Sequence, residues 1–148
     1  MKRILSIAMV LFAMTMMVKA SDDKPINVEQ LPKAAKEFIA THFANEKIAV
    51  AKQDTDFMDK DYKVIFVSGN KVEFDKKGVW KEVDCERSSV PSSIIPSQIK
   101  TYLKSNYPDK VVTQIENKNK GKYKYEIELD NSMEIKFNKS FEVVEIDY

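Results

Sequence analysis

The sequence predicts an α+β protein built as a tandem of two units, each with one helix and an antiparallel sheet. Two segments of similar sequence indicate this, because residues 31–43 (LPKAAKEFIATHF) return as residues 95–107 (IPSQIKTYLKSNY). Each is followed by strand-like segments in which apolar and polar residues alternate. Similarity at a fixed spacing is typical of repeated structural units. The matching strand segments are residues 62–66 with 125–129 and residues 72–76 with 135–139.

The first twenty residues are typical of a secretory signal peptide. Lys2 and Arg3 precede an apolar run that reaches Val18, and small residues follow at the expected cleavage position. A retained membrane anchor is the alternative, because residues 1–20 are near the shortest length that spans a bilayer. We expect a periplasmic or secreted protein that meets the membrane only through this leader. The predicted domain covers residues 21–148, with units at about 26–86 and 88–148.

The first unit is expected to open with a helix over residues 31–44. Pro32 suits the first turn of a helix, where its missing N–H has no partner to lose. The buried stripe is predicted from spacings of three and four residues. Glycine residues in the turns at 68–70 and 75–78 allow positive φ between the strands that follow. The residues of the stripe are Leu31, Ala35, Phe38, Ile39 and His42 or Phe43.

The second unit follows a linker at residues 86–93 that is rich in serine and has no periodicity. Its helix is expected to begin at Ile95 and to end before Pro108, which cannot continue a helix. Residues 123–129 and 133–137 then alternate between apolar and polar side chains. We expect about four antiparallel strands in each unit, with the helices on one face of the sheet and the other face open to water.

Composition excludes several classes of function. Charged residues make up 32% of the 148-residue chain, which excludes a multi-pass membrane protein. The leader carries three of the 24 basic residues and none of the 23 acidic ones, so the mature chain has a net charge of about −2. That balance argues against nucleic acid as a partner. Cys85 is the single cysteine, so no intramolecular disulfide is possible.

The sequence offers few groups for catalysis, and we expect a protein that is not an enzyme and needs no cofactor. His42 is the single histidine, which excludes a metal site with several histidines. A pair of Cys85 and His42 is the alternative that an enzyme would use. We favour packing roles for both residues, since His42 lies on or beside the apolar stripe of the first helix and a buried cysteine at a strand end usually acts as a small apolar residue.

An acidic hairpin is the candidate for a metal or small-ligand site. Calcium is bound by several carboxylates that converge from one loop. The segment lacks the central glycine of an EF-hand loop, and the place of the bidentate glutamate falls on Ile65. A solvated hairpin loop is the alternative. The candidate residues are Asp54, Asp56, Asp59 and Asp61.

The outer face of the first unit is the candidate protein-binding surface. Ile65 and Val67 correspond to Glu128 and Asp130 in the second unit, and a strand face open to water is expected to be polar. We therefore predict that a partner covers Ile65 and Val67; contact with the neighbouring unit or with a second copy in a homodimer are the alternatives. Trp80 either joins them as an anchor or belongs to the core. The predicted charged rim consists of Lys63, Lys71, Glu73 and Glu82.

These features resemble the secreted PepSY-like proteins of the Bacteroidetes, a group described as β-lactamase-inhibitor-like. The resemblance rests on the leader, on the two segments that begin Leu/Ile-Pro, and on the turn VEFDKKGVW at residues 72–80, and it extends over residues 26–148. It implies paired αβ units that present a concave antiparallel sheet, and it implies no enzyme activity, cofactor or established ligand. No inhibitory motif can be aligned.

The expected function is a non-enzymatic binding module for an unknown protein of the cell envelope, which includes an inhibitor or regulator of an envelope enzyme. The alternative is a small-ligand or calcium-binding envelope protein.

Overall fold

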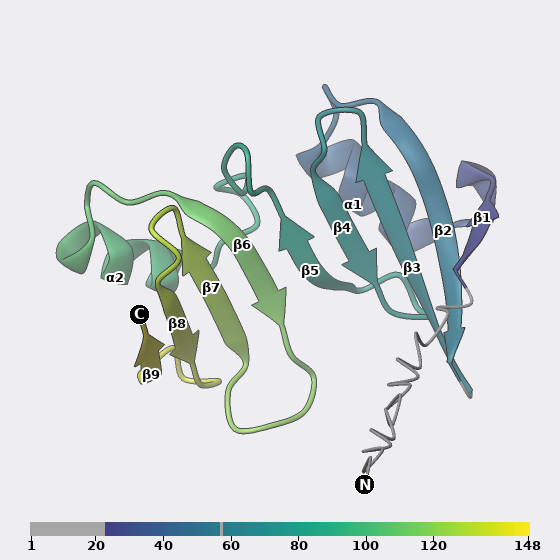
Figure 1. Ribbon diagram of the computed structural model, residues 1–148. Helices are drawn as coiled ribbons and strands as arrows, with labels where there is room; N and C mark the ends of the chain where they lie inside the picture. Colours follow the sequence, from purple (N-terminus) through teal and green to yellow (C-terminus); the bar gives the residue numbers. More distant parts are fainter. Residues whose placement is uncertain (1–22, 57) are drawn as a thin grey trace, which may run out of the picture.

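A computed structural model describes residues 23–56 and 58–148. Within them the strands form one antiparallel sheet in which every strand pairs with its neighbours in chain order, from β1 to β9. Both helices lie behind this sheet in Figure 1, so the opposite face is turned to the viewer. The predicted signal peptide at residues 1–20 falls outside the described residues.

The elements run as follows. The first part of the chain gives β1 (Lys24–Ile26), a 3₁₀ turn η1 (Val28–Gln30), α1 (Lys33–His42), β2 (Ile48–Asp56), β3 (Asp59–Phe66), β4 (Lys71–Phe74) and β5 (Trp80–Asp84). The second part gives α2 (Ser97–Asn106), β6 (Val112–Asn117), β7 (Tyr125–Leu129), β8 (Glu134–Phe137) and β9 (Val143–Asp147).

Each helix buries a narrow apolar stripe against the sheet. In α1, Ala35 and Ile39 are buried one turn apart, and the ring of Phe38 meets Phe74 of β4 edge to face at 5.6 Å. The second helix repeats this arrangement, since the ring of Tyr102 meets Phe137 of β8 edge to face at 5.4 Å. Aromatic pairs of this geometry add to the stability gained by area burial alone.

A close approach of backbone fixes the start of α1 against the turn between β4 and β5. Gly78 in this turn has φ +83°, a conformation that favours glycine. A Cβ atom at this position would lie 2.8 Å from the backbone nitrogen of Ala35 and 2.8 Å from Cβ of Pro32. The turn can therefore contact the first turn of the helix only because residue 78 has no side chain.

The expectation of a tandem of two helix-plus-sheet units is wrong, although the α+β class and the placement of the helices agree with the structure. The sheet is not divided, because β5 pairs directly with β6 through Glu82 with Glu116, Val83 with Ile115 and Asp84 with Gln114. Within residues 23–56 and 58–148, five strands precede α2 and four follow it. Similar local sequence therefore produces similar helices here, while strand pairing between distant segments produces one continuous sheet.

The core lies between the helices and one face of this sheet. Its largest fully buried side chains come mainly from the strands and from α2, and Val90 of the linker, with Ile94 and Ile95 just after it, adds to them. These residues alternate along each strand with side chains on the opposite face, as the pleat of a strand requires. The buried set that defines the helix side includes Val64, Phe66, Val72, Phe74, Val83, Ile115, Ile127, Ile135 and Phe137.

Candidate functional site

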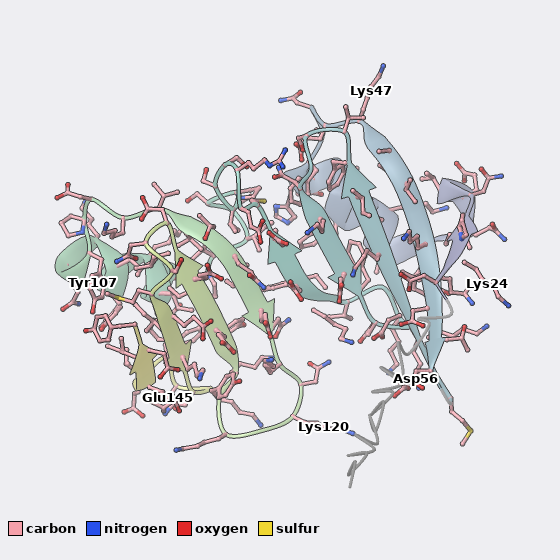
Figure 2. All side chains as sticks on the ribbon, viewed as in Figure 1. Lys24, Lys47, Asp56, Tyr107, Lys120 and Glu145 are labelled. Carbon is pink, nitrogen blue, oxygen red and sulfur yellow. The ribbon has the colours of Figure 1, made fainter. Side chains whose placement is uncertain are left out.

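The candidate site is the sheet face that the helices leave uncovered. Val64 and Val72 are fully buried on the helix side, so Lys63, Ile65 and Lys71 project from the other face. Glu73 projects there too, because it follows Val72 in the same strand. In Figure 2 the side chains of this face are seen in front of the ribbon, spread over most of the sheet.

Three apolar side chains gather on this face at one end of β2 and β3. Val50 lies directly opposite Ile65 in the sheet and is 37% exposed. Val67 follows β3 and is 70% exposed, while Ile65 itself is half-buried. The structure therefore brings together two of the predicted anchors, Ile65 and Val67, and adds Val50 to them.

Trp80 lies on the helix side of the sheet and not beside Ile65. It is opposite Phe74, and its ring stacks on Phe38 with centroids 6.1 Å apart. A bulge between β4 and β5 makes Lys81 an extra residue between two paired positions, which sets the direction of the tryptophan. Of the two roles considered for Trp80, this packing fits a core residue, and an anchor on the open face does not agree with it.

Four glutamates stand side by side across the centre of the open face, and we call them the glutamate row. Consecutive members occupy directly opposite positions on neighbouring strands. Like charges that face one another in this way destabilise a sheet. A lysine borders the row at the β3 end, because Nζ of Lys63 lies 2.5 Å from Oε1 of Glu73. The glutamate row consists of Glu73, Glu82, Glu116 and Glu126.

Glu82 has the most unfavourable surroundings in the row. Burial raises its pKa to about 6, and the charges of Glu73, Glu116 and Asp84 act in the same direction. The charge of Lys63 opposes this shift and is the smaller effect. The Nε2 group of Gln114 donates a hydrogen bond of 2.8 Å to Glu82, which gives the carboxylate a neutral partner but no counter-charge.

The face is hollowed at the end where three connections meet. A pocket of about 630 Å³ lies between the tip of the β2–β3 hairpin, the β4–β5 turn and the start of the β6–β7 segment. Figure 2 labels Asp56 and Lys120 on two of these connections. The pocket is lined mainly by charged residues, and the carboxylates of Glu73, Glu82 and Glu116 form part of its wall. This arrangement suits charged side chains better than an apolar ligand.

The acidic hairpin does not gather its carboxylates around one point. Asp54 pairs with Asp61 and Asp56 with Asp59 across β2 and β3. Lys81 lies 2.5 Å from Asp61, and Lys76 lies 3.3 Å from Asp59. In residues 23–56 and 58–148 no group of three or more histidine, cysteine, aspartate or glutamate side chains is placed to hold a metal ion.

The two reactive side chains of the chain have separate surroundings. Nδ1 of His42 lies 2.8 Å from Oγ of Ser93 in the linker, and burial lowers the pKa of this histidine. Cys85 is fully buried at the end of β5, and burial together with the charges of Glu46 and Asp84 raises the pKa of its thiol to about 11. A thiol with this pKa stays protonated at neutral pH and is a poor nucleophile.

Sequence reasoning placed Glu128 on the polar outer face, but it did not include the residues of β6, β7 and β8 in the candidate site. Gln114, Glu116, Glu126 and Glu134 project there beside the predicted rim residues Glu73 and Glu82. The alternation of polar and apolar residues along each strand could have predicted that these four side chains lie on the open face. The sequence carries no local signal for the pairing of β5 with β6, and without this pairing these residues could not be placed next to Glu82.

No helix in the part of the chain that the structure describes combines the length and the apolar character needed to cross a membrane.

Comparisons with known proteins agree on one family. A family model described as "putative beta-lactamase-inhibitor-like, PepSY-like" matches residues 16–58 and 60–145. No curated protein matches the chain. Solved structures of three Bacteroides proteins are similar to it over most of their length.

A "putative periplasmic protein" from Bacteroides vulgatus is 51% identical, with 87% of this chain and 99% of that chain covered and a TM-score of 0.80. A "putative calcium-regulated periplasmic protein" from Bacteroides thetaiotaomicron is also 51% identical, with coverages of 86% and 98% and a TM-score of 0.80. A second protein from Bacteroides vulgatus, described as a "putative periplasmic protein of unknown function", is 37% identical, with coverages of 85% and 99% and a TM-score of 0.79.

These findings confirm the resemblance seen in the sequence and the predicted location outside the cytoplasm. The chain belongs to the PepSY-like, β-lactamase-inhibitor-like family, and like these relatives it is a periplasmic protein.

Proposed function

We propose that this protein is a non-enzymatic periplasmic binding module whose open sheet face docks a protein of the cell envelope. The observation that carries the proposal is the uncovered face itself, which presents exposed Val50 and Val67 together with Ile65. Surface strands with apolar residues next to charged ones suit a contact that has an apolar centre and a polar rim.

The face is large enough for such a contact. The nine strands of the described part of the chain lie about 4.8 Å apart and extend over roughly 38 Å. Five-residue strands are about 17 Å long, which gives a face on the order of 650 Å² before side-chain relief is counted. A stable complex buries about 800 Å² on each partner. A partner that fills the face and touches the loops at its end would reach this value.

The family description supports an inhibitor or regulator of an envelope enzyme as the specific role. The surroundings of the reactive groups support a protein without catalytic activity of its own. Cys85 is buried with a raised thiol pKa, and His42 is engaged with Ser93. Neither residue lines the pocket on the open face.

The proposal is tested by capture of partners on the immobilised chain from residue 21 to 148. Envelope and culture fractions of the source organism are passed over three baits: the wild type, Ile65→Asp on the open face, and Thr101→Asp on the exposed side of α2. Mass spectrometry identifies the retained proteins, and circular dichroism verifies that each bait is folded.

A partner that Thr101→Asp retains and Ile65→Asp loses is the expected result. A partner that Ile65→Asp retains and Thr101→Asp loses would place the contact on the helices and contradict the proposal. Unfolding of Ile65→Asp would show that Ile65 is needed by the core, and Val67→Asp, at a more exposed position, then takes its place.

A second candidate function is binding of calcium, which the name of the Bacteroides thetaiotaomicron relative favours. The acidic hairpin remains the proposed site, although Lys76 and Lys81 occupy positions that an ion would have to compete for. Calcium at millimolar concentration is expected to raise the melting temperature of the wild type, magnesium much less, and Asp56→Asn is expected to abolish the shift. An equal shift in the variant would exclude the hairpin as the site.

A further inference from the structure

The open face is strongly asymmetric in charge, and this identifies the chemistry of a partner that would fit it. Over β2 to β4 the face presents Val50, Ile65 and a balanced set of charges, in which the lysines Lys52, Lys63 and Lys71 are matched by Asp54, Asp61 and Glu73. Over β5 to β8 it is dominated by carboxylates, and we call this part the acidic half. The acidic half contains Glu82, Asp84, Glu116, Glu126, Glu128 and Glu134.

The lysines near the acidic half neutralise only part of this charge. Asp84 lies 3.1 Å from Lys71, and Lys118 contacts Glu116 and lies 4.0 Å from Glu126. Within the described residues the side chains of three further carboxylates have no lysine or arginine at ion-pair distance. Two of them face each other directly on β7 and β8. These three are Glu82, Glu128 and Glu134.

Among the described residues, the strands of the acidic half carry two lysines, Lys81 on β5 and Lys136 on β8. Lys81 pairs with Asp61 of β3, and the ammonium group of Lys136 is turned toward the sheet edge. It lies 2.6 Å from Glu145 and 2.9 Å from Asp147, both on β9. Glu126 lies directly opposite Lys136 in the sheet, but its ion pair is formed with Lys118 instead. Negative charge therefore remains in excess on the acidic half, because Lys136 forms its ion pairs with β9 and not with the carboxylates of this half.

We infer that the partner presents lysine or arginine side chains to the acidic half while its apolar residues contact Val50, Ile65 and Val67. This inference rests on the proposed function and specifies the partner's chemistry. Each cation placed between two facing glutamates would replace a repulsion with an attraction. Arginine can also bind a carboxylate through two parallel hydrogen bonds, and flanking strands offer carboxylates in a regular row.

Other occupants fit this face less well. Anionic lipid surfaces and nucleic acids carry the same sign of charge as the acidic half. A second copy of the chain would have to supply its basic residues from β2 to β4. There Lys52 already pairs with Asp23, Lys63 with Glu73, and Lys71 with Asp84, so a homodimer would have to break these pairs.

Binding of cations to this face is expected to depend on pH. The groups around Glu82 are Glu73 on β4, Asp84 on its own strand, Glu116 on β6 and, as the opposing charge, Lys63 on β3. Their combined effect and burial give Glu82 a pKa of about 6. A basic partner should therefore bind more weakly at pH 5.5 than at pH 7.5, and Glu82→Gln should reduce this difference.

The experiment is a titration of the isotope-labelled chain, followed by amide chemical shifts, with two synthetic peptides. One peptide alternates lysine and threonine, and the other alternates glutamate and threonine. The variants are Glu116→Gln with Glu126→Gln on the face and, as a control with the same change of charge, Glu29→Gln with Glu37→Gln. The control pair lies on η1 and the exposed side of α1, away from the open face.

The lysine peptide is expected to shift amides of β5 to β8, and the glutamate peptide is expected to have no effect there. Affinity should fall about tenfold in the face variant, as expected for the loss of two facing charges, and less than twofold in the control. Shifts spread evenly over the surface, or an equal loss in both double variants, would overturn the inference. A dimer in sedimentation that the face variant disperses would also overturn it, in favour of a second copy.

The captured partner separates this inference from the proposed function. A partner that Ile65→Asp loses and the double variant Glu116→Gln with Glu126→Gln retains would overturn the inference of a basic partner. The proposed function as a binding module would still stand. A partner that is lost both with Ile65→Asp and with the double glutamate variant supports the proposed function and the inference of a basic partner.

Discussion

Replacing Glu82 by glutamine is expected to stabilise this protein at neutral pH, although the change removes a charged residue from a sheet rich in ion pairs. The carboxylate is partly buried beside Glu73 and Glu116, and its pKa is raised from 4.5 to about 6. Glutamine keeps an oxygen that can accept the hydrogen bond from Gln114. The variant therefore removes the repulsion and retains the neutral contact.

The magnitude follows from the pKa shift. A difference of about 1.5 units between the folded and unfolded states corresponds to about 2 kcal/mol as an upper limit. Screening by water at this partly exposed position reduces it to about 1 kcal/mol. Because an acid with a raised pKa favours the folded state in its protonated form, its contribution is fully present below pH 4.5 and is lost as the pH rises through about 6.

Urea unfolding of the wild type and of Glu82→Gln at pH 7.5 and at pH 4.5 measures this effect as a difference in the free energy of unfolding. We expect the variant to be more stable by about 1 kcal/mol at pH 7.5, or about 3–5 °C in melting temperature, and nearly equal to the wild type at pH 4.5. Glu86→Gln in the exposed loop after β5 is the control, with little change expected at either pH. A variant that is less stable at pH 7.5, or a difference that is the same at both pH values, would refute the reasoning.

Three further changes test the fold around the site. Gly78→Ala should lower the free energy of unfolding in urea by at least about 1 kcal/mol more than Gly69→Ala does. Both residues have positive φ, but only at position 78 would a Cβ atom press against α1. Equal losses in the two variants would contradict the close approach. Asn70→Ala should cost about 1–3 kcal/mol, since this buried amide donates to Glu46 and accepts from a serine hydroxyl in the linker; a loss below about 0.5 kcal/mol would show that the network is dispensable. Cys85 should react with iodoacetamide at pH 8 much more slowly in the native protein than in urea, because burial raises the pKa of its thiol to about 11; equal rates would mean that the end of β5 is open to solvent.

Local periodicity was enough to predict the helices and many of the strands. The helix expected over residues 31–44 is α1 at Lys33–His42, and the helix expected from Ile95 is α2 at Ser97–Asn106. Proline at the start and a stripe of apolar residues with spacings of three and four determine both. The alternation of residues 123–129 likewise predicts β7 at Tyr125–Leu129 and its buried face.

The continuity of the sheet could not be predicted in this way. The pairing of β5 with β6 joins Glu82 to Glu116 across more than thirty intervening residues, and it extends over only three pairs. Local alternation gives the face of each residue but not the identity of the neighbouring strand. For the same reason β1, with three residues that include Pro25, had no periodic signal of its own.

The candidate site was predicted in part for the same physical reasons. Lys63, Ile65 and Lys71 lie on regular stretches of strand, and the structure places them on the open face as alternation requires. Trp80 lies next to a bulge, where an extra residue breaks the period of two, so its direction could not be read from the sequence. The glutamate row could not be predicted either, because it requires the pairing register of four strands, one pair of which is far apart in the sequence.

The most direct test of the central claim, that the open sheet face is the binding surface, is a lysine footprint of the protein in complex with its captured partner. Brief acetylation followed by mass spectrometry reports the accessibility of each lysine with and without the partner. Lys63 and Lys71 lie on the open face, whereas Lys33 and Lys100 lie on the helices. The account predicts that the partner protects Lys63 and Lys71 and leaves Lys33 and Lys100 unchanged. Protection of Lys33 and Lys100 with no change at Lys63 and Lys71 would contradict it.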